Sequence, residues 1–260
     1  MRRLLAAGIV LGAVVSGLGV VRAMSADAAA VPPYHPTKLA KVADSRQVVV
    51  VVGKSRGSSY STVYTYQLGA DGKTWTAKFP AMAARNGYAG WAWAGQRIQD
   101  SGTTPMGTFR ITQTFGLKNG PSTKMPWTRA DTNDYWVGDN KDPKTYNMFQ
   151  PSASAQRTWR TGEAERLAAY PTQYEFAAVI DYNRPAPTSI TWDATHGQYV
   201  TSKPANVKRG SAIFLHVKGA GSTAGCVSLS RSDVVRVLQW LDPAQLPRIV
   251  MAPTADLGKV

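Results

Sequence analysis

The sequence has very few of the side chains that bind metals or form disulfides. It holds one cysteine, Cys226, and three histidines, at positions 35, 196 and 216. One cysteine cannot form an intramolecular disulfide, so packing alone must stabilise the fold. These four side chains lack the ligand spacing of a zinc site, and no Walker or dinucleotide glycine motif is present. We therefore predict neither a metal nor a cofactor.

Acidic residues are also scarce, since 16 Asp and Glu stand against 30 Lys and Arg, a net charge of +14. Such a balance is typical of proteins that bind nucleic acid, a membrane surface or an anionic polymer. Zinc-finger spacing, RNA-binding signatures and dense Lys/Arg tracts are missing, which argues against a nucleic-acid partner. Because the basic residues are spread out, two interpretations stay open: an ordinary solvated surface, or a surface that binds anionic cell-wall polymers.

The N-terminus is typical of an exported protein. A positive start at residues 1–3 precedes an apolar stretch at residues 4–21, and the small residues of RAMSADAAA follow. This order predicts a signal peptide over residues 1–30 and a secreted protein that works at the cell wall. The apolar stretch exceeds the roughly 7–15 residues of a typical signal. An uncleaved N-terminal membrane anchor is therefore the alternative, and the only membrane contact that the sequence suggests.

The rest of the chain is long enough for one domain with a proper core. We expect a short extended leader over residues 31–45, a domain over 46–252 and a tail over 253–260. Strands are predicted from β-branched runs, from alternation of apolar and polar residues, and from flanking turn signals. They cover residues 46–53, 58–68, 74–79, 109–112, 174–183, 189–194, 211–217 and 248–252.

One helix is predicted near the end of the chain. Ser230 can cap it, with Asp233 completing a capping pattern, and apolar residues recur at helical spacing from position 234 to 241. Pro243 ends it. The stretch 116–157 has no clear periodicity and is expected to be irregular. Many short strands with one or two helices favour a mainly β fold, a sandwich or a curled sheet.

The lone cysteine lies in a loop of small residues, STAGCVSLS (222–230). Cys226 can be a small buried hydrophobe or an exposed nucleophile. His216 lies ten residues earlier, inside the apolar strand AIFLHV, and three glycines separate the two. A strand and a glycine-rich return can bring the imidazole to the thiol, where a thiolate–imidazolium pair would lower the thiol pKa. The backbone N–H groups of Gly225 and Cys226 are the candidate oxyanion donors.

Two segments resemble the L,D-transpeptidase catalytic domain, the YkuD family, over roughly residues 46–252. TPMGTFRIT (104–112) matches the family's T-P-x-G-x-F segment, and STAGCVSLS matches its S-H-G-C segment loosely. Ala224 stands where the family has a second histidine, so the chain resembles an actinobacterial-type subgroup with TAGC in place of SHGC. The matched positions are Thr104, Pro105, Gly107, Phe109, His216, Ser222, Gly225, Cys226, Val227 and Leu229.

The resemblance implies a sandwich-like β domain with curled mixed sheets, and acyl transfer on peptidoglycan stem peptides. Cys226 would attack the carbonyl between the third residue, a diamino acid, and the terminal D-alanine. The amine of a second stem would then resolve the thioester into a 3→3 crosslink. His216, oriented by the Val217 carbonyl, would move the protons. Residues expected to line the substrate cleft are Ser222, Tyr182 and Asn183.

Two alternatives stay open. Water in place of the acceptor amine would make the same site an L,D-carboxypeptidase or thiol peptidase on wall peptides. Ala224, together with the basic surface, also fits a catalytically inert module that binds the cell envelope.

Overall fold

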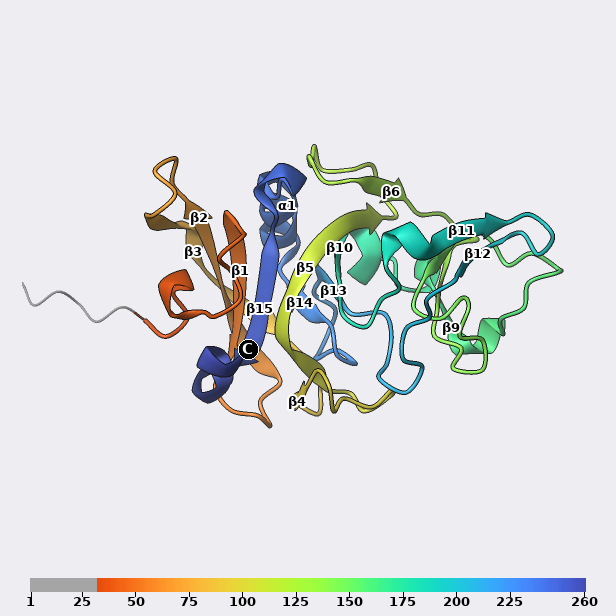
Figure 1. Cartoon of the computed structure of the whole chain (residues 1–260), viewed down its shortest axis with the longest axis horizontal. Coiled ribbons are helices and arrows are strands. Elements are labelled where there is room, and N and C mark those ends of the chain that lie inside the picture. Colours follow the sequence, from red (N-terminus) through yellow and green to blue (C-terminus); the bar gives the residue numbers. More distant parts are fainter. Residues whose placement is uncertain (1–31) are drawn as a thin grey trace, which may run out of the picture. The chain divides into compact units, whose positions relative to one another are not determined.

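The structure is a computed structural model that describes residues 32–260. The predicted signal peptide or anchor at residues 1–30 lies outside the described residues and stays a prediction. Strands dominate residues 32–260, and their one α-helix, α1 (Arg231–Trp240), is accompanied by short 3-10 helices (Figure 1). The mainly β fold with a curled sheet is confirmed. Over residues 32–260, none of the helices has both the length and the apolar character needed to cross a membrane.

Three sheets make up the domain. The ten strands of the main sheet are β1 (Gln47–Gly53), β2 (Tyr60–Leu68), β3 (Trp75–Arg85), β4 (Trp91–Trp93), β5 (Thr104–Gly116), β6 (Trp127–Arg129), β10 (Ala177–Ile180), β13 (Phe214–Val217), β14 (Val227–Leu229) and β15 (Arg248–Pro253). A small sheet contains β7 (Tyr135–Val137), β8 (Phe149–Gln150) and β9 (Ala164–Arg166), and a hairpin contains β11 (Ile190–Asp193) and β12 (Gln198–Thr201). The 3-10 helices are η1 (Pro36–Lys38), η2 (Thr161–Glu163), η3 (Leu167–Ala169), η4 (Gln173–Glu175), η5 (Pro187–Ser189), η6 (Pro243–Gln245) and η7 (Thr254–Lys259).

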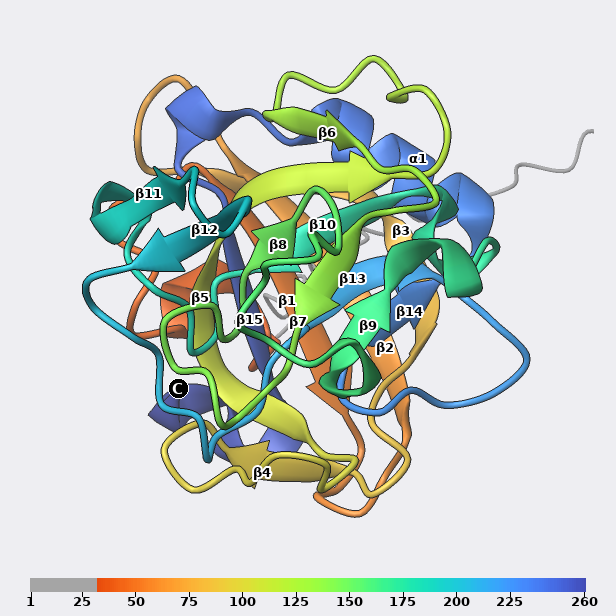
Figure 2. The same ribbon diagram turned by 90° about the vertical axis from the view of Figure 1, so that its right-hand side faces the viewer.

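The main sheet curls back on itself. Its strand order is β10-β13-β14-β3-β2-β1-β15-β5-β4, with β6 beside β5. β10 pairs with β13 and also with β5, so strands from the two ends of this order meet (Figure 2). The first four of the five consecutive valines of β1, at positions 48–51, are fully buried between β2 and β15. Burial of each such side chain stabilises the fold by roughly 1.5–3 kcal/mol, which explains why this run forms a central strand.

The predicted elements at both ends of the sequence are confirmed. β1, β2 and β15 lie where the apolar runs predict them, and β3 begins as predicted but continues to Arg85, beyond the predicted end at residue 79. Asp71-Gly72 forms the turn between β2 and β3, with Gly72 at a φ of +67°. Ser230 caps α1 by accepting a hydrogen bond from the N–H of Asp233. Helix α1 packs on β10 and β13 through an apolar face that is fully buried: Val234, Val237 and Leu238.

Four predicted segments differ from the structure. The segment expected as a strand over 174–183 opens with η4, and only Ala177–Ile180 is extended. The stretch 116–157, expected to be irregular, contains β6, β7 and β8: β7 and β8 pair with each other, β6 pairs with β5, and β7 also pairs with β9. The leader is not simply extended: it contains η1 and buries Leu39 and Val42 in the main core. The tail also packs there through Leu257 and Val260.

Period-2 alternation in β10 and β13 divides the apolar side chains between two cores. Leu215 and Val217 face the main core, which includes α1. Phe214 faces a second core, which also contains Trp136 from β7, Tyr174 from η4 and Cys226. Both faces of these strands are therefore covered, which explains their continuous apolar sequence. The second core is the one that carries the candidate site.

Candidate active site

His216 and Cys226 lie on the same side of two adjacent parallel strands. In the register of β13 and β14, Leu215 pairs with Val227 and His216 pairs with Ser228. Leu215 and Val227 face the main core. Side chains alternate along a strand, so His216 and Cys226 both point to the opposite side. The imidazole and the thiol are thus diagonal neighbours, as the spacing between them in the sequence predicts.

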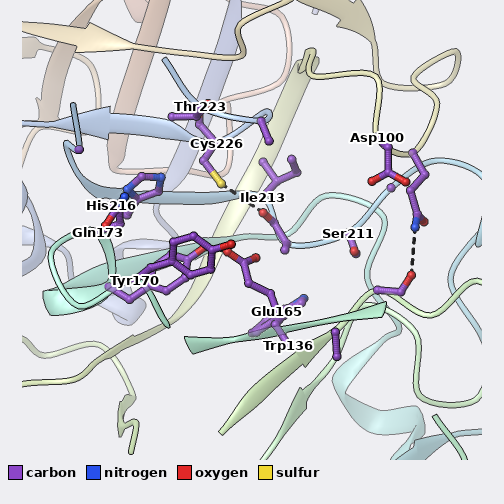
Figure 3. A pocket seen from close by; sticks show the side chains of 18 of the residues that line it. Asp100, Trp136, Glu165, Tyr170, Gln173, Ser211, Ile213, His216, Thr223 and Cys226 are labelled. Carbon is purple, nitrogen blue, oxygen red and sulfur yellow. Dashed lines mark hydrogen bonds between the residues drawn. The ribbon is translucent and has the colours of Figure 1, made fainter. Parts of the chain in front are cut away.

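A cavity of about 540 Å³ opens in front of these two side chains. Its far wall comes from the small sheet and the segment after it, with Trp136 on β7, Glu165 on β9, and Tyr170 (Figure 3). The cavity therefore lies between the main sheet and the layer built around β7 and β9.

The His216 side chain is fixed in one tautomer. Its Nδ1 lies 2.8 Å from the carbonyl oxygen of Val217, and a carbonyl can only accept, so Nδ1 carries the proton. This leaves Nε2 as a neutral acceptor. The side chain is 5% exposed, and burial lowers the pKa of His216 to about 4, although the bond to Val217 acts in the opposite direction. His216 is therefore an uncharged base at neutral pH, and the carbonyl expected to orient it is in place.

Cys226 is held as a neutral thiol. Its Sγ donates to the carbonyl oxygen of Ala212 at 3.1 Å and accepts from the N–H of Phe214 at 3.4 Å. Burial, reinforced by the nearby negative charge of Glu165, raises the pKa of Cys226 to about 12. The thiolate–imidazolium pair expected from the sequence is therefore not the resting state. Desolvation disfavours both charged forms, so the resting pair is a thiol and a neutral imidazole.

The loop before Cys226 is tied to the first motif segment. Thr104, at the start of β5, donates its hydroxyl to the carbonyl oxygen of Gly225 at 2.8 Å and accepts from the N–H of Gly87. Within the loop, the Thr223 hydroxyl donates to the carbonyl oxygen of Cys226 at 2.6 Å. These bonds explain physically why segment 104–112 and segment 222–230 belong to one site.

One of the two expected oxyanion donors is already occupied. The N–H of Gly225 donates to the Thr223 hydroxyl at 3.1 Å, which contradicts a free donor at this position. The N–H of Cys226 has no hydrogen-bond acceptor among residues 32–260 and stays the candidate. Gly225 has a φ of +143°, and a Cβ there would lie 2.9 Å from the Nη2 of Arg97. Glycine is therefore needed for backbone geometry and space.

Comparison with protein-family models identifies the domain. The model of the L,D-transpeptidase catalytic domain, YkuD, matches residues 47–250. The chain belongs to the YkuD family. This family consists of L,D-transpeptidase catalytic domains.

Other comparisons are more distant. The crystal structure of the helical cell shape determining protein Pgp2 from Campylobacter jejuni is 13% identical, with a TM-score of 0.39. The match covers 81% of this chain and 48% of that one, so the chain spans about half the length of that protein. A comparison with curated proteins gave no match.

Two predicted cleft residues of this YkuD domain lie elsewhere. Tyr182 is buried behind the site, where its hydroxyl donates to the carbonyl oxygen of Arg209 at 2.8 Å. Asn183 holds the following loop by donating to the carbonyl oxygens of Asn206 and Gly210. Both side chains therefore act on the packing of the 206–210 segment and do not reach the cavity wall. Ser222, in contrast, does line the cavity.

Sequence reasoning missed Arg97 and Glu165 on the cavity wall. Each lies in a short segment without a recognisable pattern, GQRIQD and AERL. No motif or periodicity marks them. Contacts between segments that are far apart in the sequence bring both residues to the cavity.

The other two histidines lie apart from the cavity wall. Over residues 32–260 no group of three or more His, Cys, Asp or Glu side chains is arranged to hold a metal ion.

Proposed function

We propose that this protein is an exported peptidoglycan L,D-transpeptidase that forms 3→3 crosslinks, with Cys226 as nucleophile and His216 as base. One observation carries the proposal. The only thiol of the chain and a neutral imidazole with a free Nε2 lie on the same side of adjacent strands and line one cavity. A base beside a nucleophile, itself oriented by a third group, is the arrangement that acyl transfer requires.

Acylation begins with loss of the thiol proton. Because the resting thiol has a high pKa, His216 Nε2 takes its proton as Sγ attacks the carbonyl carbon of the third stem residue. The N–H of Cys226 donates to the oxyanion that forms. When the C–N bond breaks, the imidazolium returns its proton to the leaving amine of D-alanine. A thioester on Cys226 and free D-alanine are the products of this half-reaction.

Deacylation reverses these roles. The side-chain amine of a second stem attacks the thioester carbonyl, and His216 Nε2 accepts the proton that the amine loses. The C–S bond breaks, an amide links the third residues of the two stems, and the proton passes to the Cys226 sulfur. Water in place of the amine gives hydrolysis, the L,D-carboxypeptidase reaction, by the same movements.

Arg97 supports the assignment to a subgroup with TAGC in place of SHGC. Its guanidinium donates to the carbonyl oxygen of Thr103 at 2.7 Å and to that of Ala224 at 3.4 Å. Ala224 is the position at which the second family histidine is replaced. We propose that Arg97 orders this loop where that histidine is missing.

We place the enzyme outside the cytoplasmic membrane, at the cell wall. The charged start, apolar stretch and small residues of segment 1–30 support export. The net charge of +14 supports contact with anionic wall polymers. Binding to isolated cell walls should weaken steeply between about 50 and 500 mM salt, since screening shortens the reach of exposed charges. Absent or salt-insensitive binding would contradict the wall-polymer partner.

The test of the reaction uses mature protein, a disaccharide-tetrapeptide and intact-mass spectrometry, with Cys226→Ser alongside. A transpeptidase gives an acyl adduct on the wild type, free D-alanine and a crosslinked dimer, and Cys226→Ser gives none of these. An adduct and D-alanine without dimer, even with excess acceptor stem, would indicate the carboxypeptidase. A folded protein that never forms an adduct would indicate the inert envelope-binding module.

A further inference from the structure

The charge of the cavity wall is opposite to that of the chain. The protein as a whole has a net charge of +14. Three carboxylates line the cavity, those of Asp100, Glu163 and Glu165, and Arg97 is the one lysine or arginine among its lining residues. A basic protein therefore presents an acidic cavity beside its thiol.

The Arg97 guanidinium is not available to bind a ligand in this acidic cavity. Its three donor nitrogens each bond a backbone carbonyl oxygen, those of Thr103, Arg209 and Ala224. The side chain is 4% exposed. The guanidinium is thus committed to holding loops together and leaves little donor capacity for a substrate carboxylate.

Glu165 is the least exposed of the three carboxylates and has no cation beside it in the described part of the chain. Asp100 is exposed at the rim, and Glu163 has Arg160 at 3.5 Å. Glu165 accepts a hydrogen bond from the Tyr174 hydroxyl at 2.5 Å, and no Lys, Arg or His of residues 32–260 lies within ion-pair distance of it. Figure 3 shows its side chain on the wall across from Cys226.

We propose that Glu165 is the specificity-determining residue for the donor stem, binding the side-chain ammonium of its third residue. This inference rests on the proposed function, in which the carbonyl of that residue is the one attacked. The side chain next to the scissile carbonyl then extends from the thiol across the cavity. A primary ammonium on this side chain is the group that complements a half-buried carboxylate without a cation.

The same contact links binding to activation of the thiol. The negative charge of Glu165 raises the pKa of Cys226, and burial raises the pKa of Glu165 itself. A docked ammonium favours the charged form of Glu165 and cancels its field at the sulfur. Removal of the thiol proton therefore becomes easier when a cationic donor is bound. This coupling explains why a carboxylate is tolerated beside a nucleophile that it disfavours.

The experiment measures single-turnover acylation by intact mass, without an acceptor. It uses two donors: a disaccharide-tetrapeptide with a free side-chain amine, and the same compound acetylated at that amine. In the wild type, acetylation should slow acylation by about 30-fold or more, the lower end of the range for truncating one partner of a buried charge pair. Glu165→Gln keeps an acceptor for Tyr174 and should lose most of this preference, through slower reaction of the free-amine donor. The matched control is Glu163→Gln. Glu163 lies on the same wall but is exposed and ion-paired with Arg160, so this variant should keep the preference for the free-amine donor.

The outcomes separate the two proposals. A wild type that forms no adduct with either donor overturns the proposed function. A wild type that reacts equally fast with both donors keeps the function and overturns the role of Glu165, whatever the fold of the variant. The role of Glu165 is also overturned if the Glu165→Gln variant, with an unchanged melting temperature, keeps the preference for the free-amine donor. Glu165→Gln should also shift alkylation of Cys226 by iodoacetamide to lower pH, because a negative charge is removed.

Discussion

The two walls of the cavity differ in construction and in charge. The nucleophile wall belongs to the main sheet, and its two reactive side chains are both neutral at rest and held by backbone carbonyls. The recognition wall belongs to the layer of β7 and β9 and carries Glu165, a carboxylate without a cation partner in residues 32–260. The difference supports the two proposals, that one wall holds the reacting atoms and that the other selects the substrate.

The largest expected effect lies on the nucleophile wall. Cys226→Ala should abolish acylation, a loss of at least about 1,000-fold, because no other thiol is present in the chain. The melting temperature should change little, since the side chain is small and the sulfur makes only two weak hydrogen bonds. Intact-mass spectrometry measures the acyl adduct, and thermal unfolding measures the melting temperature. Acylation of this variant at the wild-type rate would show that Cys226 is not the nucleophile.

The His216→Gln substitution should have the next largest effect on acylation. Loss of a general base typically slows a reaction about 10²- to 10⁴-fold. Glutamine can still donate to the Val217 carbonyl, so the fold should be retained. Stopped-flow release of D-alanine, with circular dichroism as the control for folding, gives the comparison. Wild-type acylation in the folded variant would remove His216 from the mechanism.

Substitution of Thr104 tests whether the first motif segment, residues 104–112, supports only the nucleophile wall. Thr104→Val keeps the shape but leaves the Gly225 carbonyl and the Gly87 N–H without their buried partner. The expected loss is about 1–3 kcal/mol of unfolding free energy, together with slower acylation. Thr104→Ser, which keeps the hydroxyl, is the matched control. The preference between free-amine and acetylated donors should survive, and its loss would show that the two walls are not independent.

The smallest effect is a contrast in pH dependence between the two layers. The pKa of His216 is lowered to about 4 by burial, so its contribution to stability is present above about pH 6.5 and lost as the pH falls through 4. The pKa of Asp134, just before β7, is raised to about 6 by burial. Its contribution is fully present below about pH 3.8 and lost as the pH rises through 6.

Denaturant unfolding between pH 4 and 8 measures this contrast. His216→Gln should lose less stability than the wild type on acidification, and Asp134→Asn should gain stability over the wild type at pH 7. Each shift should be on the order of 1–3 kcal/mol. If stability changes with pH in the same way in both variants as in the wild type, the opposite pH dependences expected for His216 and Asp134 are contradicted.

Sequence patterns predicted the nucleophile wall well and the recognition wall hardly at all. β1 and α1 follow from local signals, a valine run and a capped amphipathic segment. The nearness of His216 and Cys226 follows from a short loop between adjacent strands. β7 and β9 are three residues long and exist because they pair with each other across the intervening chain. Such strands have no local signature, because long-range pairing forms them.

The sequence by itself determined that the domain is mainly β, which residues are its candidate nucleophile and base, and that no disulfide supports it. These properties depend on residue type, spacing and periodicity. The tertiary structure alone decided that Tyr182 and Asn183 do not line the cavity, that the Gly225 N–H is occupied, and that the thiol rests neutral. It also brought Glu165 opposite Cys226. Burial and hydrogen-bond partners set these properties, and both arise from contacts between segments far apart in the chain.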